Sequence, residues 1–270
     1  MTRRLGWLPT LALAAAAAPT LADQPLWELG LGAGALSLPH YRGSDQRHSW
    51  LLPVPYAVYR GKIFRATREG ARAVLLESER FDFDLSVDAS APARSGDNVA
   101  RAGMPDLEPT VEFGPSLNLT LGRGSGWRLD LRLPVRAVFT LGSDARGIGV
   151  TANPVLNLDL QLQGWNLGLQ GGPLFASRAH HAHFYSVPPA YANADRPAYG
   201  APGGTAGWRF TVGASRRFGD LWAGAFLRTD SLAGAVFEAS PLVRQRDNVA
   251  FGLALSWVFA RSDARVADDR

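Results

Sequence analysis

WRLDLRLPVRAVFTL, residues 127–141, is the stretch that decides the fold. Its odd-numbered positions are all apolar: Trp127, Leu129, Leu131, Leu133, Val135, Ala137, Phe139 and Leu141. Its even-numbered positions include four charged residues: Arg128, Asp130, Arg132 and Arg136. A strand points successive side chains to opposite faces, so one face here needs hydrocarbon and the other needs water or charged partners. A tilted strand crosses a bilayer with about nine to eleven residues, and the stretch therefore predicts a wall strand of a transmembrane β-barrel.

The same alternation recurs in residues 81–88, 111–121, 152–162 and 165–175. No formally charged residue lies on the apolar face of these segments. A basic residue there would cost about 2–4 kcal/mol at the bilayer midplane. The alternative for a single long strand is a soluble β-protein, and the recurrence favours the barrel.

The predicted fold class is all-β, a transmembrane antiparallel up-and-down β-barrel of about twelve strands, an even number as in bacterial single-chain barrels. The long connections, residues 90–107, 178–205 and 231–247, all fall on one side, and short turns, most of which contain glycine, fall on the other. Aromatic residues are predicted at the periplasmic boundary: Trp27, Phe81, Trp127, Trp165 and Trp222. The predicted strands are residues 26–38, 48–59, 61–68, 72–78, 81–89, 108–121, 127–141, 149–162, 165–177, 206–217, 221–230 and 248–259.

The two ends of the chain predict export to the outer membrane of a Gram-negative-type envelope. Residues 1–22 have the basic start, short apolar run and small residues of a cleavable signal peptide. The barrel is predicted over residues 23–259, and its last strand ends in an aromatic residue, as is typical of outer-membrane barrels. Residues 260–270 are polar and carry both signs of charge, so we expect a periplasmic tail without regular structure.

The composition limits the partners. The chain has no cysteine, which excludes disulfides and thiolate sites. The net charge is +4, and Lys62 is the only lysine, so the basic character comes from arginine. Arginine suits bidentate pairing with phosphate, and we expect outer-membrane lipid and lipopolysaccharide as partners. We expect no nucleic-acid partner, because the barrel is predicted to be exported and its sequence contains no run of basic residues.

Ten charged residues are predicted to face the lumen. Their signs are mixed, so they could pair with one another and fill the space. They could equally line a narrow water channel, and both interpretations remain open at this point. The residues are Asp82, Asp84, Asp88, Glu112, Arg128, Asp130, Arg132, Arg136, Asp159 and Arg209.

Three segments in the long connections share a loop character. They are PHYRGSD at residues 39–45, ARAGMPDLEP at residues 100–109 and SPLV at residues 240–243. Gly43 and Gly103 permit positive φ, and prolines stiffen the approach to the next strand. We therefore expect these segments to fold the loops.

Together the three segments resemble the MipA/OmpV family of outer-membrane proteins. The resemblance implies a barrel without known catalytic activity, without a cofactor and without a shared active site. It also implies a scaffold whose partners are a lytic transglycosylase and a peptidoglycan synthase. The matching motif residues are Tyr41, Gly43, Ser44, Asp45, Arg101, Gly103, Met104, Pro105, Asp106, Leu107, Ser240 and Pro241.

A histidine cluster raises the question of a metal site. His180, His181 and His183 lie in one long connection, and imidazole is a common metal ligand. The nearest carboxylate in the sequence, Asp195, is distant, and there is no cysteine. We therefore expect a solvated loop and no metal.

An outer-membrane hydrolase is the rival function class, and a narrow pore for small solutes is another. Ser44, Asp45, His48 and His180 would lie near the outer rim. No Gly-x-Ser-x-Gly elbow occurs, and spacing alone brings no pair of these residues together. We predict that the chain is not an enzyme.

Overall fold

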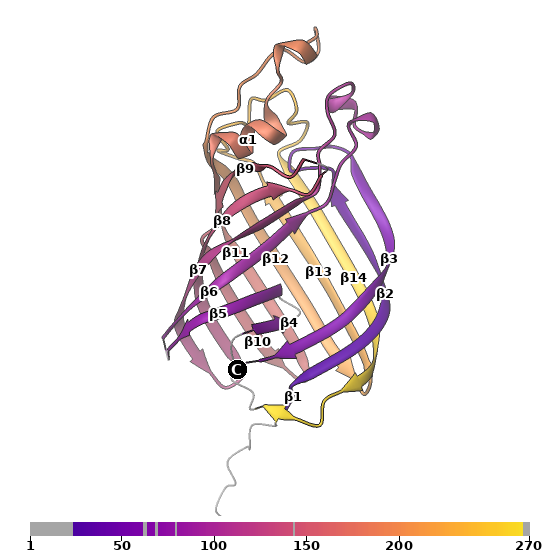
Figure 1. The fold of residues 1–270 in the computed structure, drawn as a ribbon, viewed down its shortest axis with the longest axis vertical. Coiled ribbons are helices and arrows are strands. Elements are labelled where there is room, and N and C mark those ends of the chain that lie inside the picture. The colour runs from indigo at the N-terminus through magenta and orange to yellow at the C-terminus, as the bar shows by residue number, and fades with distance from the viewer. Residues whose placement is uncertain (1–23, 62–63, 68–69, 79, 143, 267–270) are drawn as a thin grey trace, which may run out of the picture.

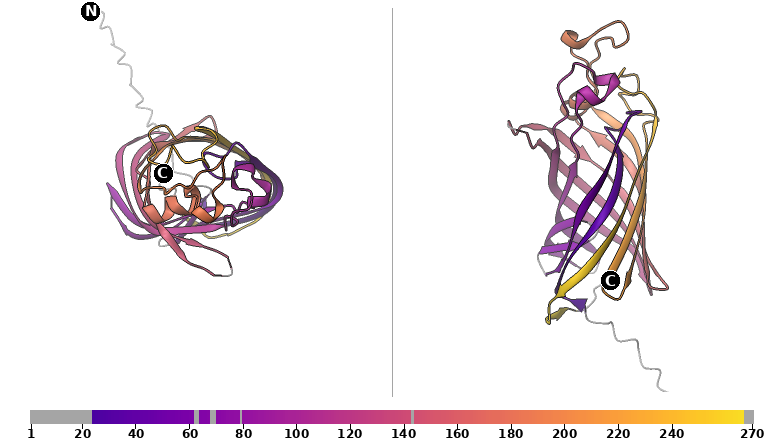
Figure 2. Two further views of the ribbon diagram at one scale, coloured as in Figure 1. Left: turned by 90° about the horizontal axis from the view of Figure 1, so that it is seen from above. Right: turned by 90° about the vertical axis from the view of Figure 1, so that its right-hand side faces the viewer.

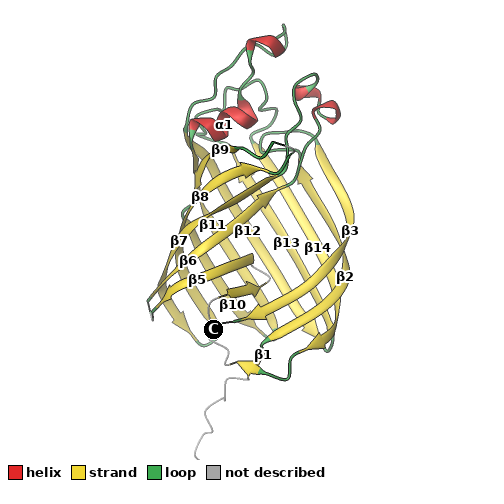
Figure 3. Cartoon of the chain, viewed as in Figure 1, coloured by secondary structure: helices red, strands yellow, loops and turns green. Residues whose placement is uncertain are grey.

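The computed structural model describes residues 24–266, except residues 62–63, 68–69, 79 and 143. They form one large antiparallel sheet, a two-stranded ribbon and short helices (Figures 1 and 3). The predicted signal peptide and residues 267–270 of the predicted tail lie outside the described residues. The strands are β1 Gln24–Pro25, β2 Trp27–Pro39, β3 Arg47–Arg60, β4 Phe64–Thr67, β5 Gly70–Glu77, β6 Phe81–Ser90, β7 Thr110–Gly124, β8 Trp127–Thr140, β9 Gly147–Ala152, β10 Val155–Leu162, β11 Trp165–Ala176, β12 Gly204–Phe218, β13 Leu221–Ser231, β14 Asp247–Arg261 and β15 Arg265–Val266. The helices are α1 Arg178–Tyr185 and the 3₁₀ turns η1 Ser95–Asp97, η2 Val99–Arg101 and η3 Pro189–Tyr191.

The sheet closes on itself through β9 and β10, which are two halves of one strand. Asn153 and Pro154 interrupt that strand, because proline has no N–H to donate to the ladder. β8 pairs with both halves on one side, and β11 pairs with both on the other. β14 pairs with β2 and joins the two ends of the chain. With β9 and β10 counted together, the wall has twelve antiparallel strands, as predicted.

All twelve predicted strands are present, with ends shifted by a few residues, and their two faces differ in burial as the alternation predicts. On β14 the outward residues Leu253, Leu255 and Trp257 are 57%, 53% and 58% exposed. The inward residues Ala250 and Val258 on the same strand are each 1% exposed. The outward face is therefore the apolar one, and it is the surface that meets lipid.

Short turns lie at one end of the barrel and long loops at the other, as predicted (Figure 1). Gln163 and Gly164 join β10 to β11 with φ of +50° and +81°. Positive φ at both central residues is the signature of a two-residue type I′ hairpin. In outer-membrane barrels the short turns are periplasmic, so the other end is external.

The predicted tail was expected to lack regular structure, but its described part is ordered. β14 continues to Arg261, beyond the predicted last strand. Ser262 and Trp27 then exchange two hydrogen bonds, of 3.0 and 3.1 Å. β15 follows and pairs with β1 beside the periplasmic mouth. A two-residue strand leaves no periodicity in the sequence, which is why the alternation gave no sign of it.

One of the aromatic residues predicted at the periplasmic boundary faces the lumen instead. Trp222 packs against Tyr56, with ring centroids 5.6 Å apart, and against Val58 and Val258. Its neighbour Leu221, 45% exposed, has the outward position. On β13 the even-numbered residues point inward, as the buried Asp230 shows, and Trp222 lies on that face.

The largest hydrophobic core lies in the external loops. We call residues 40–46, 91–109, 177–203 and 232–246 the external cap. These loops fold together over the external mouth of the barrel, as Figures 1 and 2 show. Loop residues supply nearly all of this core, since the lumen faces of the strands are largely polar. Among the described residues, no helix is long and apolar enough to cross a membrane.

Candidate functional site

Charged side chains form a connected ladder on the lumen side of β8 and its neighbours. Arg128 Nε donates to both carboxylate oxygens of Asp130, at 2.9 and 3.0 Å, and Arg128 Nη2 lies 3.5 Å from Asp82. Arg132 Nη2 lies 3.5 Å from Asp159 on β10. Several of these residues line a lumen cavity of about 950 Å³. Paired charges and an open cavity therefore exist side by side in this lumen.

The remaining predicted lumen residues of β6, β7 and β8 also have polar partners. These partners belong to strands one or two places away in the sheet, so the pairs run along the wall and stiffen it. The pairs are Asp84 with Asn118 at 2.8 Å, Glu112 with Thr151 at 2.8 Å, Arg136 with Ser86 at 2.7 Å and Arg136 with Asp88 at 3.8 Å.

Asp230 is the centre of a buried ion cluster at the external end of the lumen. Its carboxylate, only 1% exposed, lies 3.0 Å from Arg42 Nε, 2.8 Å from Arg209 Nε and 3.1 Å from Arg228 Nε. Sequence reasoning singled out only Arg209. The inward alternation of β13 could have found Asp230 and Arg228, whereas Arg42 lies in a loop that has no periodicity.

The motif at residues 39–45 ties the first external loop to the last one. Tyr41 Oη donates to the Leu242 carbonyl at 2.8 Å. The Gly43 N–H donates to Asn248 Oδ1 at 2.5 Å, and Asn248 Nδ2 donates to the Ser44 carbonyl at 2.8 Å. Gly43 has a φ of +96°, which glycine adopts without strain. The motif residues thus close the cap through backbone contacts.

Arg101 organises the second motif. Its buried guanidinium donates to the carbonyls of Pro105 and Phe184, at 3.0 and 3.1 Å, and to Ser95 Oγ at 3.2 Å. Asp106 Oδ1 accepts the Ser95 N–H at 2.7 Å. One arginine therefore links two external loops that are far apart in the sequence.

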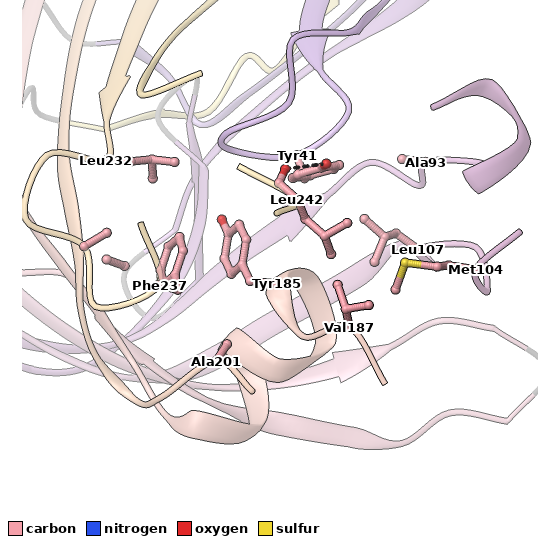
Figure 4. Close-up of a cluster of buried hydrophobic side chains, with 12 residues drawn as sticks. Tyr41, Ala93, Met104, Leu107, Tyr185, Val187, Ala201, Leu232, Phe237 and Leu242 are labelled. Carbon is pink, nitrogen blue, oxygen red and sulfur yellow. Dashed lines mark hydrogen bonds between the residues drawn. The ribbon is translucent and has the colours of Figure 1, made fainter. Parts of the chain in front are cut away.

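Aromatic stacking lies at the heart of the cap (Figure 4). The rings of Tyr185 and Phe237 are stacked with centroids 3.7 Å apart. Ser240, which precedes Pro241, donates its Oγ hydrogen to the Tyr185 carbonyl at 2.6 Å. The third motif therefore closes over the same rings. The buried core of the cap is Tyr41, Ala93, Met104, Leu107, Tyr185, Val187, Ala201, Ala206, Leu232, Ala235, Phe237 and Leu242.

The expectation of a solvated histidine loop is wrong. The histidines lie on α1, whose first turn is capped by Ser177 Oγ accepting the His180 N–H. His181 is fully buried, with Nδ1 2.7 Å from the Pro202 carbonyl and its ring 4.5 Å from that of Phe237. A helix of eight residues with a weak apolar pattern gave no sequence signal for this packing.

Burial also sets the charge state of these histidines. It lowers the pKa of His180 to about 3, helped by the neighbouring His181 and His183. It lowers the pKa of His183 to about 4, with Arg101 adding to the effect. The cap therefore holds neutral imidazoles at neutral pH. Among the described residues, no group of three or more potential ligands is placed to hold a metal ion.

The residues considered for a hydrolase do not assemble into a nucleophile and its base. Ser44 is 1% exposed, and its Oγ donates to the Gln46 carbonyl at 3.0 Å. His48 packs edge-on against His40, with ring centroids 4.1 Å apart, while Asp45 lies at the surface near an arginine of another loop. In the part of the chain that the structure describes, no hydrogen bond joins Ser44 to a histidine.

The periplasmic end carries a second ordered assembly. We call β1, residues 262–264 and β15 the periplasmic ribbon. Beside it, the buried Glu28 accepts from Arg217 Nη1 at 2.7 Å and from Tyr56 Oη at 3.0 Å. Val266 at the end of the ribbon lines the lumen cavity. The ribbon therefore lies across the inner edge of the periplasmic mouth.

A family model described as MltA-interacting protein MipA matches residues 31–259. The chain belongs to the MipA family. The match runs from β2 to the end of the predicted barrel and includes all three loop motifs. This MipA-family chain is accordingly an outer-membrane β-barrel.

Several solved outer-membrane proteins are similar in outline to the MipA-family barrel. A bacterial polysaccharide outer membrane secretin matches with a TM-score of 0.45 and 10% identity, over 87% of this chain and 99% of its own. The COG4313 outer membrane channel from Pseudomonas putida F1 matches with a TM-score of 0.43 and 14% identity, over 91% of this chain and 100% of its own. Outer membrane phospholipase A from Escherichia coli matches with a TM-score of 0.34 and 9% identity, over 88% of this chain and 95% of its own. No curated protein matches the chain, and the family assignment rests on the family model alone.

Proposed function

We propose that this barrel is a non-catalytic scaffold that holds a peptidoglycan-remodelling enzyme at the periplasmic face of the outer membrane. The observation that carries the proposal is the contrast between the two ends of the barrel. The external end is covered by a packed cap, while the periplasmic end presents an ordered ribbon. The family description, MltA-interacting protein, points to a lytic transglycosylase as the partner, and a peptidoglycan synthase is the second partner in this proposal.

The cap argues for a scaffold because a solute would have to displace it. Burying one large apolar side chain is worth about 1.5–3 kcal/mol, and the cap buries Leu232, Phe237 and Leu242 completely. The Asp230 cluster lies beside this layer, since Arg42 of the cap reaches into it. Opening the external mouth would therefore break both a hydrophobic core and a buried ion cluster.

The periplasmic ribbon has the features of a docking surface for a protein. Asp263 and Arg265 are exposed and carry opposite charges, and Arg261 forms an ion pair with Asp220 on the adjacent turn. Charges of both signs on an ordered edge select a partner by complementarity and fix its orientation. Because the ribbon is already folded, a partner would not pay the ordering entropy of a disordered tail.

The test uses the absence of cysteine in the chain. Asp263→Cys places a single thiol on the ribbon, and the control Asp195→Cys places one on an exposed external loop. Each variant, expressed in whole cells, is treated with a thiol-directed photo-cross-linker. We expect Asp263→Cys to capture a lytic transglycosylase and Asp195→Cys to capture none. Failure of both variants to capture a murein enzyme would refute the scaffold.

A narrow pore for small solutes is the second candidate, and the lumen cavity of about 950 Å³ favours it. The purified barrel in a planar bilayer distinguishes the two functions. Steady single-channel conductance together with no murein-enzyme partner would establish the pore. A silent barrel that captures a transglycosylase supports the scaffold.

A further inference from the structure

The barrel wall has a gap between β3 and β6. Within the described residues, the short hairpin β4–β5 pairs with β3 through Tyr59 and Arg60. Among the described residues, Arg47 to Pro55 of β3 have strand pairings with β2 alone. On the other side of the gap, Val87 to Ser90 of β6 extend beyond their last pairing with β5. Figure 1 shows β3 and β6 diverging above the hairpin.

Two prolines lie on the edge of β3 that faces the gap. The Arg60 N–H donates to the Leu26 carbonyl at 2.8 Å, on the β2 side. N–H groups alternate between the two edges of a strand, so the odd-numbered residues of β3 point theirs away from β2. Pro53 and Pro55 are odd-numbered, and proline has no N–H. The edge that faces the gap therefore lacks two of its donors.

The missing donors indicate what can cover this edge. A backbone donor left unpaired in hydrocarbon costs several kcal/mol, so each proline lowers the cost of exposing this edge to a membrane. A neighbouring β-strand would need those donors to complete its ladder, and prolines on an edge disfavour such pairing. A hydrocarbon chain makes no hydrogen bonds, so it has no need of the two N–H groups that the prolines lack.

The side chains at the gap are apolar on both faces of β3. Leu51 points outward and is 81% exposed, while Leu52 lines the lumen cavity and is still 43% exposed. Val54 of β3 and Leu36 of β2 continue this lining on the same side of the cavity. An apolar strip thus runs from the membrane-facing surface into the lumen.

Glycine makes room along this strip. A Cβ atom on Gly252 would lie 2.5 Å from a ring carbon of Phe226 and 3.2 Å from Leu36 Cδ1. A Cβ atom on Gly34 would lie 2.8 Å from Val54 Cγ2. The apolar side chains therefore lie directly against bare backbone, which keeps the cavity wide. The charged ladder of β8 and β10 lines the same cavity from other strands.

We propose that the gap between β3 and β6 is a lateral opening through which the hydrocarbon chain of a membrane lipid enters the lumen. The chain lies against Leu52, Val54 and Leu36, beyond the proline edge of β3. The cavity, at about 950 Å³, is near the upper end of the 300–1,000 Å³ range of ligand sites. The charged ladder offers the polar end of the lipid a place in the same lumen. This binding site is separate from the periplasmic ribbon.

The experiment uses the full chain in phosphatidylcholine vesicles that contain palmitic acid with a diazirine near the end of its chain. After illumination, mass spectrometry maps the labelled residues. We expect label on the inward residues Leu52 and Val54 as well as on the outward Leu51. Label on Leu51 with none on Leu52 and Val54 would overturn the proposal, because any strand in a bilayer is labelled on its outer face.

A matched pair of variants provides the second arm. Leu52→Trp fills the strip from the inward face, whereas Leu51→Trp adds the same ring to the outward face of the adjacent residue. We expect Leu52→Trp to lower the labelling of Val54 severalfold and Leu51→Trp to leave it unchanged. An equal labelling of Val54 in both variants would overturn the proposal. If Leu52→Trp does not fold, the labelling map of the unaltered protein decides.

Discussion

Replacing Asp230 with asparagine should be the most damaging single polar change in this barrel. The carboxylate is 1% exposed and lies within 3.1 Å of the guanidinium nitrogens of Arg42, Arg209 and Arg228. Asparagine keeps the size of the side chain and removes the charge. The variant leaves three cations around a neutral amide at the junction between the barrel and the external cap.

The size of the expected loss of stability follows from the burial of the Asp230 carboxylate. Removing one partner of a buried, hydrogen-bonded ion pair costs about 3–5 kcal/mol, because the remaining charge is left without compensation. Asp220 provides the matched control, since its carboxylate also pairs with an arginine, Arg261, but is 56% exposed. An exposed pair contributes only about 0–1 kcal/mol. Asp230→Asn should therefore destabilise the fold several times more than Asp220→Asn does.

The assay is urea unfolding of both variants in lipid vesicles, followed by tryptophan fluorescence and by the gel mobility shift of the folded barrel. We expect a clear fall in the unfolding midpoint for Asp230→Asn and almost none for Asp220→Asn. The loops of the cap should become more mobile in the first variant, which limited proteolysis would detect as faster cleavage. Equal midpoints for the two variants would refute the reasoning, since they would mean that water or lipid headgroups reach the Asp230 cluster.

Three further outcomes are expected. Leu131→Arg puts a charge on the lipid face at a cost of about 2–4 kcal/mol, so it should lower the folding yield in vesicles far more than Arg132→Leu, and equal yields would contradict the assignment of faces. His180 and His183 have pKa values of about 3 and 4, against about 6.5 when unfolded. Their contribution to stability is complete above pH 6.5 and is lost as the pH falls through those values, so the cap should become protease-sensitive on acidification. Gly43→Ala should weaken the cap, because φ is +96° and the new Cβ would lie 2.9 Å from Leu232 Cδ1; an unchanged thermal midpoint would contradict this.

The wall of the barrel could be predicted because its cause is local. In residues 127–141 the polarity of each side chain, at a period of two residues, predicts which face of the strand it lies on, and no contact with a distant segment is needed for this prediction. The lengths of the connections then gave the orientation. The break at Pro154 was concealed by the alternation, because apolar residues continue on the same face across it.

The cap and its ion cluster could not be predicted in the same way. Arg42 meets Asp230 only because two loops fold over one another, and His181 is buried only because Phe237 comes to lie against it. Contacts between loops have no period, so histidines in a polar context looked solvated. The periplasmic ribbon was missed for a related reason, since two residues of pairing cannot be told from a tail without regular structure.

The prolines of β3 show that one segment can indicate two structural features at once, a strand and an edge with missing hydrogen-bond donors. Alternation predicted a strand over residues 48–59, and a strand is present. Pro53 and Pro55, at the same spacing of two, also remove two hydrogen-bond donors from one edge of that strand. Counting an even number of strands assumes that every strand edge is paired along its length, and under this assumption the gap beside β3 was not predicted. A wall that is closed at its periplasmic end by pairing, and opened towards the bilayer by two prolines, gives the lumen access to lipid while the cap keeps it shut to the outside.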